Sequence, residues 1–77
     1  MSYVVDTVGL RKMMAEKKIK TTEEFAKKSG VNRNTLAAVL NDKIRPSTSV
    51  MDRIVITLDM TPDVAGRIFF AKDLRNT

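Results

Sequence analysis

The sequence contains no cysteine, no histidine and no tryptophan in 77 residues, and these absences exclude several classes of function. Without cysteine there is no disulfide framework and no thiolate metal site, which fits a reducing cytoplasm. Without histidine or cysteine the chain lacks the commonest general base, the strongest nucleophile and the usual zinc ligands. The nine acidic residues form no cluster typical of a magnesium or calcium site. We therefore expect no enzyme, no metal, no cofactor and no small-molecule substrate.

Long apolar runs and helix-breaking residues are also scarce. No stretch approaches the roughly 20 apolar residues that a membrane span needs, and the first residues lack the pattern of a secretory signal. Three glycines and two prolines leave few points at which helices must break. With 43% hydrophobic and 30% charged residues, the composition predicts one small domain with a thin core. We expect a cytoplasmic protein that does not enter a membrane.

Positive charge is what the chain has in excess, with 14 basic and 9 acidic residues and a net charge of +5. The excess is concentrated between Glu16 and Arg45, where eight basic residues accompany four acidic ones. A basic surface attracts polyanions because binding releases their counterions. Nucleic acid is therefore the first partner to consider and an anionic membrane surface the second. An ordinary solvated surface is the plain alternative.

Hydrophobic spacing and capping residues predict an all-α fold with five helices. The expected helices cover residues 7–18, 22–29, 33–41 and 48–58, and a fifth begins at Thr61. Their starts are marked by polar capping residues, namely Asp6 or Thr7, Thr21, Asn32, Ser47 and Thr61. Gly30 favours the left-handed conformation that ends the second helix, and Asn41 or Asp42 favours it after the third.

The two ends of the chain are the part that a purely helical prediction explains least. Residues 3–5 and 68–71 are rich in β-branched and aromatic side chains, which favour short strands. We expect these segments to pair with each other or with a second subunit. Ile68, Phe69 and Phe70 form a candidate contact with a dimer mate or another partner, and the alternative is that all three belong to the core.

The most informative stretch is TTEEFAKKSGVNRNTLAAVLN, residues 21–41. A helix, a short turn with glycine and a second helix form the pattern of the helix-turn-helix. In that motif the first helix lies across the DNA backbone and the second enters the major groove. Ala26 fits this geometry because two helices that cross steeply need a small residue where they touch. The same spacing also describes an ordinary corner between two helices of a bundle, so spacing alone leaves both interpretations open.

Three segments together resemble the phage Cro and repressor-type helix-turn-helix family, also described as xenobiotic-response-element-type regulators. They are LRKMMAEKKIK at 10–20, TTEEFAKKSGVNRNTLAAVLNDKIRPS at 21–47 and LDMT at 58–61. The resemblance implies one compact five-helix DNA-binding domain over residues 1–77. It further implies a phage or prophage repressor of the Cro type that binds a two-fold operator as a dimer in the cytoplasm of a bacterial host. The alternative is an interaction module of the same fold that binds and modulates another phage repressor.

The resemblance also implies which residues contact duplex DNA. The base-reading positions fall on Arg33 and Asn34, with Ala37 and Ala38 one turn later. An arginine suits guanine N7 and O6, and an asparagine suits adenine N6 and N7. The candidate phosphate contacts are Thr22, Thr35, Asn41, Lys43 and Arg45. For each of these side chains the plain alternative is a solvated surface position.

Several residues depart from the family's pattern near the motif. Met14 stands where the family commonly has an arginine, so one usual phosphate or structural contact is absent. Glu23 and Glu24 lie near the groove face and would repel phosphate, although Glu24 is explained by capping. Ser29 takes a place that is usually apolar, which costs packing beneath the turn. Asp42 replaces the usual glycine after the third helix, and it suits that place only because Asp tolerates left-handed geometry.

Overall fold

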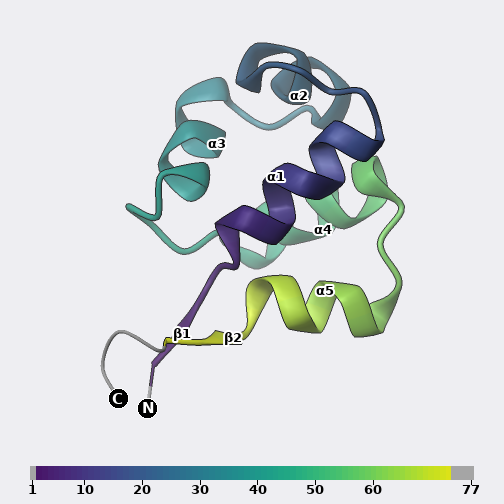
Figure 1. Ribbon diagram of the computed structural model, residues 1–77. Helices are drawn as coiled ribbons and strands as arrows, with labels where there is room; N and C mark the ends of the chain where they lie inside the picture. The colour runs from purple at the N-terminus through teal and green to yellow at the C-terminus, as the bar shows by residue number, and fades with distance from the viewer. Residues whose placement is uncertain (1, 74–77) are drawn as a thin grey trace.

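The computed structural model describes residues 2–73, which form five helices and a short two-stranded sheet. The helices are α1 (Thr7–Glu16), α2 (Thr22–Ser29), α3 (Arg33–Leu40), α4 (Thr48–Leu58) and α5 (Pro62–Phe69). Figure 1 shows α2 and α3 at one end of the molecule and α5 at the other, with α1 and α4 between them. The prediction of an all-α, five-helix fold with short terminal β segments is confirmed.

Each of these helices begins at a polar residue that the sequence marks as its cap. In α1 the cap is Asp6 rather than Thr7, and its carboxylate accepts the Gly9 N–H at 3.0 Å. The side-chain oxygens that cap α2, α3, α4 and α5 belong to Thr21, Asn32, Ser47 and Thr61. Every cap therefore occupies backbone donors that have no partner inside the helix.

Left-handed residues follow four of the helices and stop them. They are Lys18, Gly30, Asp42 and Asp59, with φ between +53° and +74°. The end of α1 differs from the prediction, because the helix stops at Glu16 and Lys18 adopts φ 61°. The Ile19 N–H then donates to the Met14 carbonyl at 2.9 Å, which closes the helix end and turns Ile19 into the core.

All five helices contribute side chains to the core. The largest fully enclosed side chains are Phe25, Phe69, Leu10, Leu36, Ile54, Leu58 and Val39. Ile68 and Phe69 are only 5% and 2% exposed, since α5 packs on α1 and faces them inward. The proposal that these two side chains form a dimer contact is therefore corrected: they are core residues. Phe70, which is 54% exposed, stays a candidate.

The chain ends meet in a small antiparallel sheet of β1 (Tyr3–Val4) and β2 (Ala71–Lys72). Tyr3 lies opposite Lys72 and Val4 lies opposite Ala71. The expected terminal pairing thus forms within one chain. The second strand begins later than the pattern suggests, because residues 68–69 remain in α5. Figure 1 shows the two strands side by side, below α1 and next to the end of α5.

Two glycines inside helices have opposite surroundings. A Cβ on Gly9 would lie 2.8 Å from Ile68 Cδ1 and 2.6 Å from Asp6 Oδ2. Any larger residue at this position would therefore have to displace the ends of the Ile68 and Asp6 side chains. A Cβ on Gly66 would meet no atom within 4 Å, so glycine there weakens α5 without any compensating contact.

We expect Gly66→Ala to raise the free energy of unfolding by about 0.5–1 kcal/mol, because alanine loses less conformational freedom in a helix. We expect Gly9→Ala to lower it by about 1–3 kcal/mol, because the added methyl overpacks the contact with Ile68. Urea titrations followed by circular dichroism measure both changes. A stabilised Gly9→Ala protein would contradict the close approach of α1 and α5.

Candidate nucleic-acid interface

The helices α2 and α3 form a helix-turn-helix unit whose turn spans residues 30–32. Gly30 has φ +74°, a conformation in which other side chains are strained. Val31 is 9% exposed and enters the core, while its N–H donates to Ser29 Oγ at 3.2 Å. The buried hydroxyl thus satisfies a backbone donor of the turn, which is the structural benefit of a serine at this usually apolar position.

Three consecutive residues at the amino end of α3, 32–34, are exposed. The Asn32 side chain caps the helix by accepting the N–H groups of Asn34 and the following residue, at 2.8 and 3.3 Å. Arg33 and Asn34 are exposed, and within residues 2–73 their side chains form no hydrogen bond or ion pair. Ala37 and Ala38, one turn later, are half-buried. The four predicted base-reading residues therefore lie together on the first two turns of α3.

Four of the predicted phosphate contacts surround the same unit. Thr22 is the first residue of α2, and Thr35 lies in the first turn of α3; both are half-buried. Asn41 follows the last residue of α3, and Lys43 is exposed in the loop beyond it. These side chains occupy the two ends of α3 and the start of α2, where a phosphodiester strand can follow the protein surface.

Arg45 has a different environment from the one predicted for a phosphate contact. Its guanidinium donates to the Phe69 carbonyl at 2.7 Å and to the Tyr3 carbonyl at 3.2 Å. The guanidinium carbon also lies 5.3 Å from the centre of the Phe70 ring, which in turn meets Tyr3 edge to face. Arg45 therefore connects the loop after α3 to both ends of the chain, and this structural role stands beside the phosphate contact, which stays a prediction.

We expect Arg45→Met to lower the free energy of unfolding by about 1–3 kcal/mol, because two charge-assisted hydrogen bonds are lost. Lys43→Met, which removes the same charge two residues earlier, should change it by no more than about 0.5 kcal/mol. Thermal unfolding of the two variants measures the difference. Equal melting temperatures would show that the Arg45 contacts contribute nothing to stability.

Arg11 of α1 is a residue that sequence reasoning missed. Its Nη2 donates to the Leu40 carbonyl at 3.1 Å and to Asn41 Oδ1 at 3.3 Å. The Leu40 carbonyl is one of the last in α3 and has no partner inside the helix. The bonded residues are 29 and 30 positions apart in the sequence. No motif or periodicity connects positions so distant, so the sequence carries no signal for this contact.

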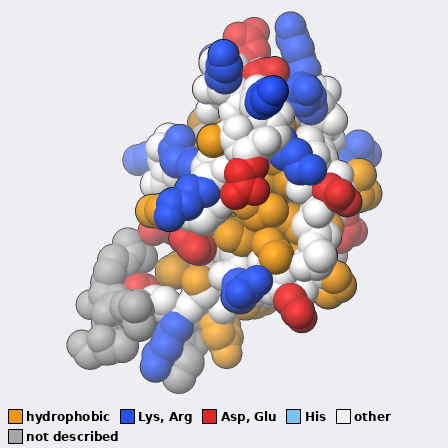
Figure 2. All heavy atoms as spheres, turned by 45° about the vertical axis from the view of Figure 1, so that its right-hand side comes forward, with side chains coloured by type: hydrophobic (Ala, Val, Ile, Leu, Met, Phe, Trp, Pro, Cys, Tyr) orange, Lys and Arg blue, Asp and Glu red, His pale blue; other side chains and the backbone are white. Residues whose placement is uncertain are grey.

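Charged side chains of both signs lie around α2. Figure 2 shows blue side chains at the upper end, where α2 lies, with red ones among them and an apolar area below. Lys27 and Lys28 occupy the last turn of α2, and Glu23 and Glu24 occupy the first. The Glu24 carboxylate accepts the Lys20 N–H at 2.9 Å, so it supports the helix start and adds a negative charge beside the candidate interface.

Metal-ligand clusters and membrane-spanning helices are absent from residues 2–73. No three His, Cys, Asp or Glu side chains in this range are grouped so as to hold a metal ion. None of the described helices combines the length and the apolar character needed to cross a bilayer.

Comparison with known protein families identifies a family that contains this helix-turn-helix unit. The family described as the Cro/C1-type HTH DNA-binding domain matches residues 9–63. The matched range runs from α1 into the first turn of α5 and includes the whole α2–turn–α3 unit. Comparisons with curated proteins and with solved structures found no match.

Proposed function

Because the chain belongs to the Cro/C1-type helix-turn-helix DNA-binding family, we propose that it is a sequence-specific transcriptional regulator that reads the major groove with α3. The observation that carries this proposal is the free amino end of α3. The side chains of Arg33 and Asn34 project from it, and within residues 2–73 they form no hydrogen bond or ion pair. In the form we favour, the regulator is a phage or prophage repressor of the Cro type in the cytoplasm of a bacterial host, and its bound form blocks transcription.

The chemistry at this end of α3 matches the edges of two base pairs. A guanidinium donates in bidentate fashion to guanine N7 and O6, and a carboxamide both donates to and accepts from adenine. Ala37 and Ala38 carry no polar atoms beyond the backbone. Their part in the proposal is to let the helix approach closely and to contact a thymine methyl group.

Phosphate contacts hold the helix in register while base contacts supply sequence information. Thr22 combines a hydroxyl donor with the backbone N–H groups at the start of α2. Thr35, Asn41 and Lys43 extend the set along α3 and into the following loop. This arrangement allows a phosphodiester strand to be held on both sides of the base-reading residues.

A second copy of the chain is the proposed partner of an apolar patch next to this interface. The patch consists of Tyr3, Ile44 and Phe70, which are 51%, 47% and 54% exposed. Arg45 bonds the Tyr3 carbonyl and stacks on Phe70, so the patch adjoins the loop that follows α3. One helix end reads too few base pairs for strong selectivity, and a symmetric pair doubles the sequence that is read.

Selection from random duplexes by the purified protein tests the function. We expect a short, palindromic site to be enriched. Arg33→Ala should cost about 1–3 kcal/mol and relax the preference at one base position. Lys43→Ala should weaken binding to all duplexes alike and reduce the salt dependence. Arg67→Ala, an exposed charge in the last turn of α5, serves as the matched control with unchanged selectivity.

The same experiment separates the regulator from an interaction module. If no duplex is enriched and the protein instead binds another transcription factor, the DNA-reading proposal is wrong and the module is right. If the parent and Arg33→Ala select the same sequence, only the base-reading role of Arg33 is contradicted, and the proposed DNA-binding function is not.

We expect self-association to depend on the apolar patch. Ile44→Ser should weaken the dimer at least tenfold, because it removes about 1.5–3 kcal/mol of apolar burial. Ile56→Ser is the matched control, since Ile56 is 77% exposed on α4 and lies outside the patch. Sedimentation equilibrium of the two variants and the parent measures the constants. A monomeric parent protein, or an equal effect of both variants, would overturn the dimer proposal.

A further inference from the structure

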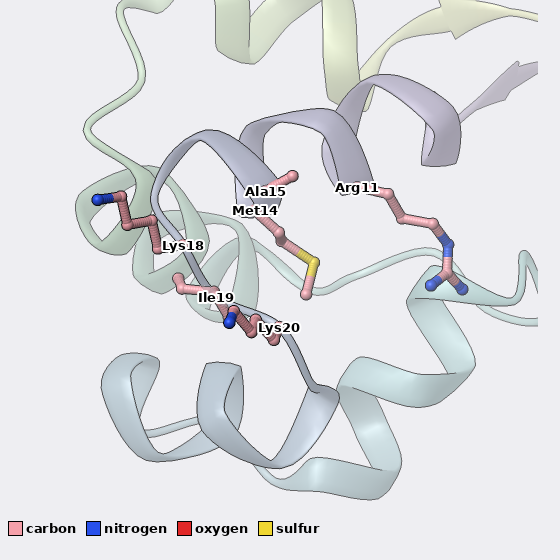
Figure 3. Close-up of a pocket in the computed structure, with 6 residues that line it drawn as sticks. All are labelled: Arg11, Met14, Ala15, Lys18, Ile19 and Lys20. Atoms are coloured by element: carbon pink, nitrogen blue, oxygen red, sulfur yellow. The ribbon is translucent and has the colours of Figure 1, made fainter.

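Arg11 and the Asn41 side chain meet beside a hollow whose lining comes from α1 and from the segment that leads to α2. The hollow has a volume of about 420 Å³ and is lined by Arg11, Met14, Ala15, Lys18, Ile19 and Lys20. Figure 3 shows Arg11 reaching from α1 toward the carboxyl end of α3 and Met14 pointing into the hollow. Three cations line it, Arg11 on the side of α3 and Lys18 and Lys20 on the side of α2, and the end of the Lys18 side chain is turned outward.

The hydrogen bonds of Arg11 determine which face of the Asn41 amide is free. An asparagine side chain carries an acceptor, Oδ1, and a donor, the Nδ2 amide. Arg11 donates to Oδ1 at 3.3 Å, so the acceptor end of the amide faces Arg11 and the Nδ2 donor points to the other side. A phosphate oxygen only accepts hydrogen bonds. The contact with Arg11 therefore leaves Asn41 in the orientation that a phosphate requires.

The guanidinium also keeps donors of its own. One terminal nitrogen, Nη2, makes both bonds, to the Leu40 carbonyl and to Asn41. The other terminal nitrogen and Nε are left, and a guanidinium presents these groups in a planar fork that fits phosphate oxygens. Arg11 is exposed as a residue, so this edge is accessible to a ligand.

We propose that Arg11 is a phosphate-binding and positioning residue of the DNA interface, acting together with Asn41. The inference rests on the proposed function and adds a residue of α1 to it. A phosphodiester strand that runs from Thr22 at the start of α2 to Asn41 at the end of α3 passes along this hollow. Arg11 binds one of its phosphates directly and fixes the Asn41 amide for the same strand.

The surroundings favour a nucleic-acid backbone over a small anion. The floor of the hollow is formed by Met14 and Ile19, which offer apolar contact for deoxyribose and no side-chain hydrogen-bond donor. Lys20 and Arg11 place positive charge at its border. The Glu24 carboxylate bonds the Lys20 N–H and adds a negative charge close to that side of the hollow.

Three variants test the inference on the operator selected by the parent protein. Arg11→Met removes the charge at nearly constant length, and Arg11→Lys keeps the charge but loses the planar fork. Lys12→Met is the matched control, because it removes the same charge from the next, exposed residue of α1. Binding is measured against salt concentration for each variant, and melting curves confirm the folded fraction.

We expect Arg11→Met to weaken operator binding about tenfold or more and to reduce the slope of log K against log salt by about 0.9. Lys12→Met should stay within about twofold of the parent. Equal salt slopes for Arg11→Met and Lys12→Met would overturn the phosphate contact. If Arg11→Met does not fold, the comparison of Arg11→Lys with the parent decides, and an unchanged operator affinity would overturn the inference.

A double-mutant cycle tests the positioning role. Asn41→Ala should weaken binding strongly when Arg11 is present and much less in the Arg11→Lys background, because the lysine does not hold the amide. Additive effects would overturn the positioning role. If the parent protein selects no duplex, the proposed function is overturned together with this inference. If the parent selects a site and the Arg11 variants bind that site as well as the parent does, only this inference is overturned.

Discussion

The buried turn between α2 and α3 is the constraint on which the rest of the arrangement depends. Val31 enters the core, Gly30 takes the left-handed conformation, and the side-chain oxygens of Ser29 and Asn32 accept backbone N–H groups on either side. Since the apolar residue is inside and the neighbouring donors are satisfied, the two helices hold one crossing geometry. That rigidity lets Arg33 project from α3 without support from other side chains, because the helix itself fixes where its amino end lies.

Local signals made most of the fold predictable. Capping residues act within one helical turn, so Thr21, Asn32, Ser47 and Thr61 mark helix starts that the structure reproduces. The end of α1 was not predictable in the same way. Lys18 has no preference for left-handed backbone, and it adopts it because burial of Ile19 compensates the local strain. Tertiary packing likewise places residues 68–69 in α5 with their side chains in the core, although the same residue types also favour a strand.

In the candidate site, too, features set by local sequence were predictable and features set by long-range contacts were not. The exposed end of α3 follows from the motif, because its position depends on local helix geometry. The roles of Arg11 and Arg45 do not, since each bonds the last carbonyls of a helix that lies far away in the sequence. Such carbonyls lack partners at every helix end and carry no sequence signature of their own. An arginine that reaches one acquires a structural contact that counting basic residues in the sequence does not reveal, whether or not its remaining donors also meet DNA.

This use of arginine has a consequence for how the proposed dimer would read its operator. Arg45 joins the loop after α3 to Tyr3 and to the end of α5, and it stacks on Phe70. Two members of the apolar patch are therefore fixed relative to the recognition helix through one side chain. In a two-fold assembly the distance between two such helices must match the repeat of the duplex. If the patch lay on a loose chain end, the distance between the two helices could vary. Because Arg45 holds the patch in place, that distance would be fixed. The Arg45 contact that stabilises the chain ends would then also determine the spacing of the two half-sites.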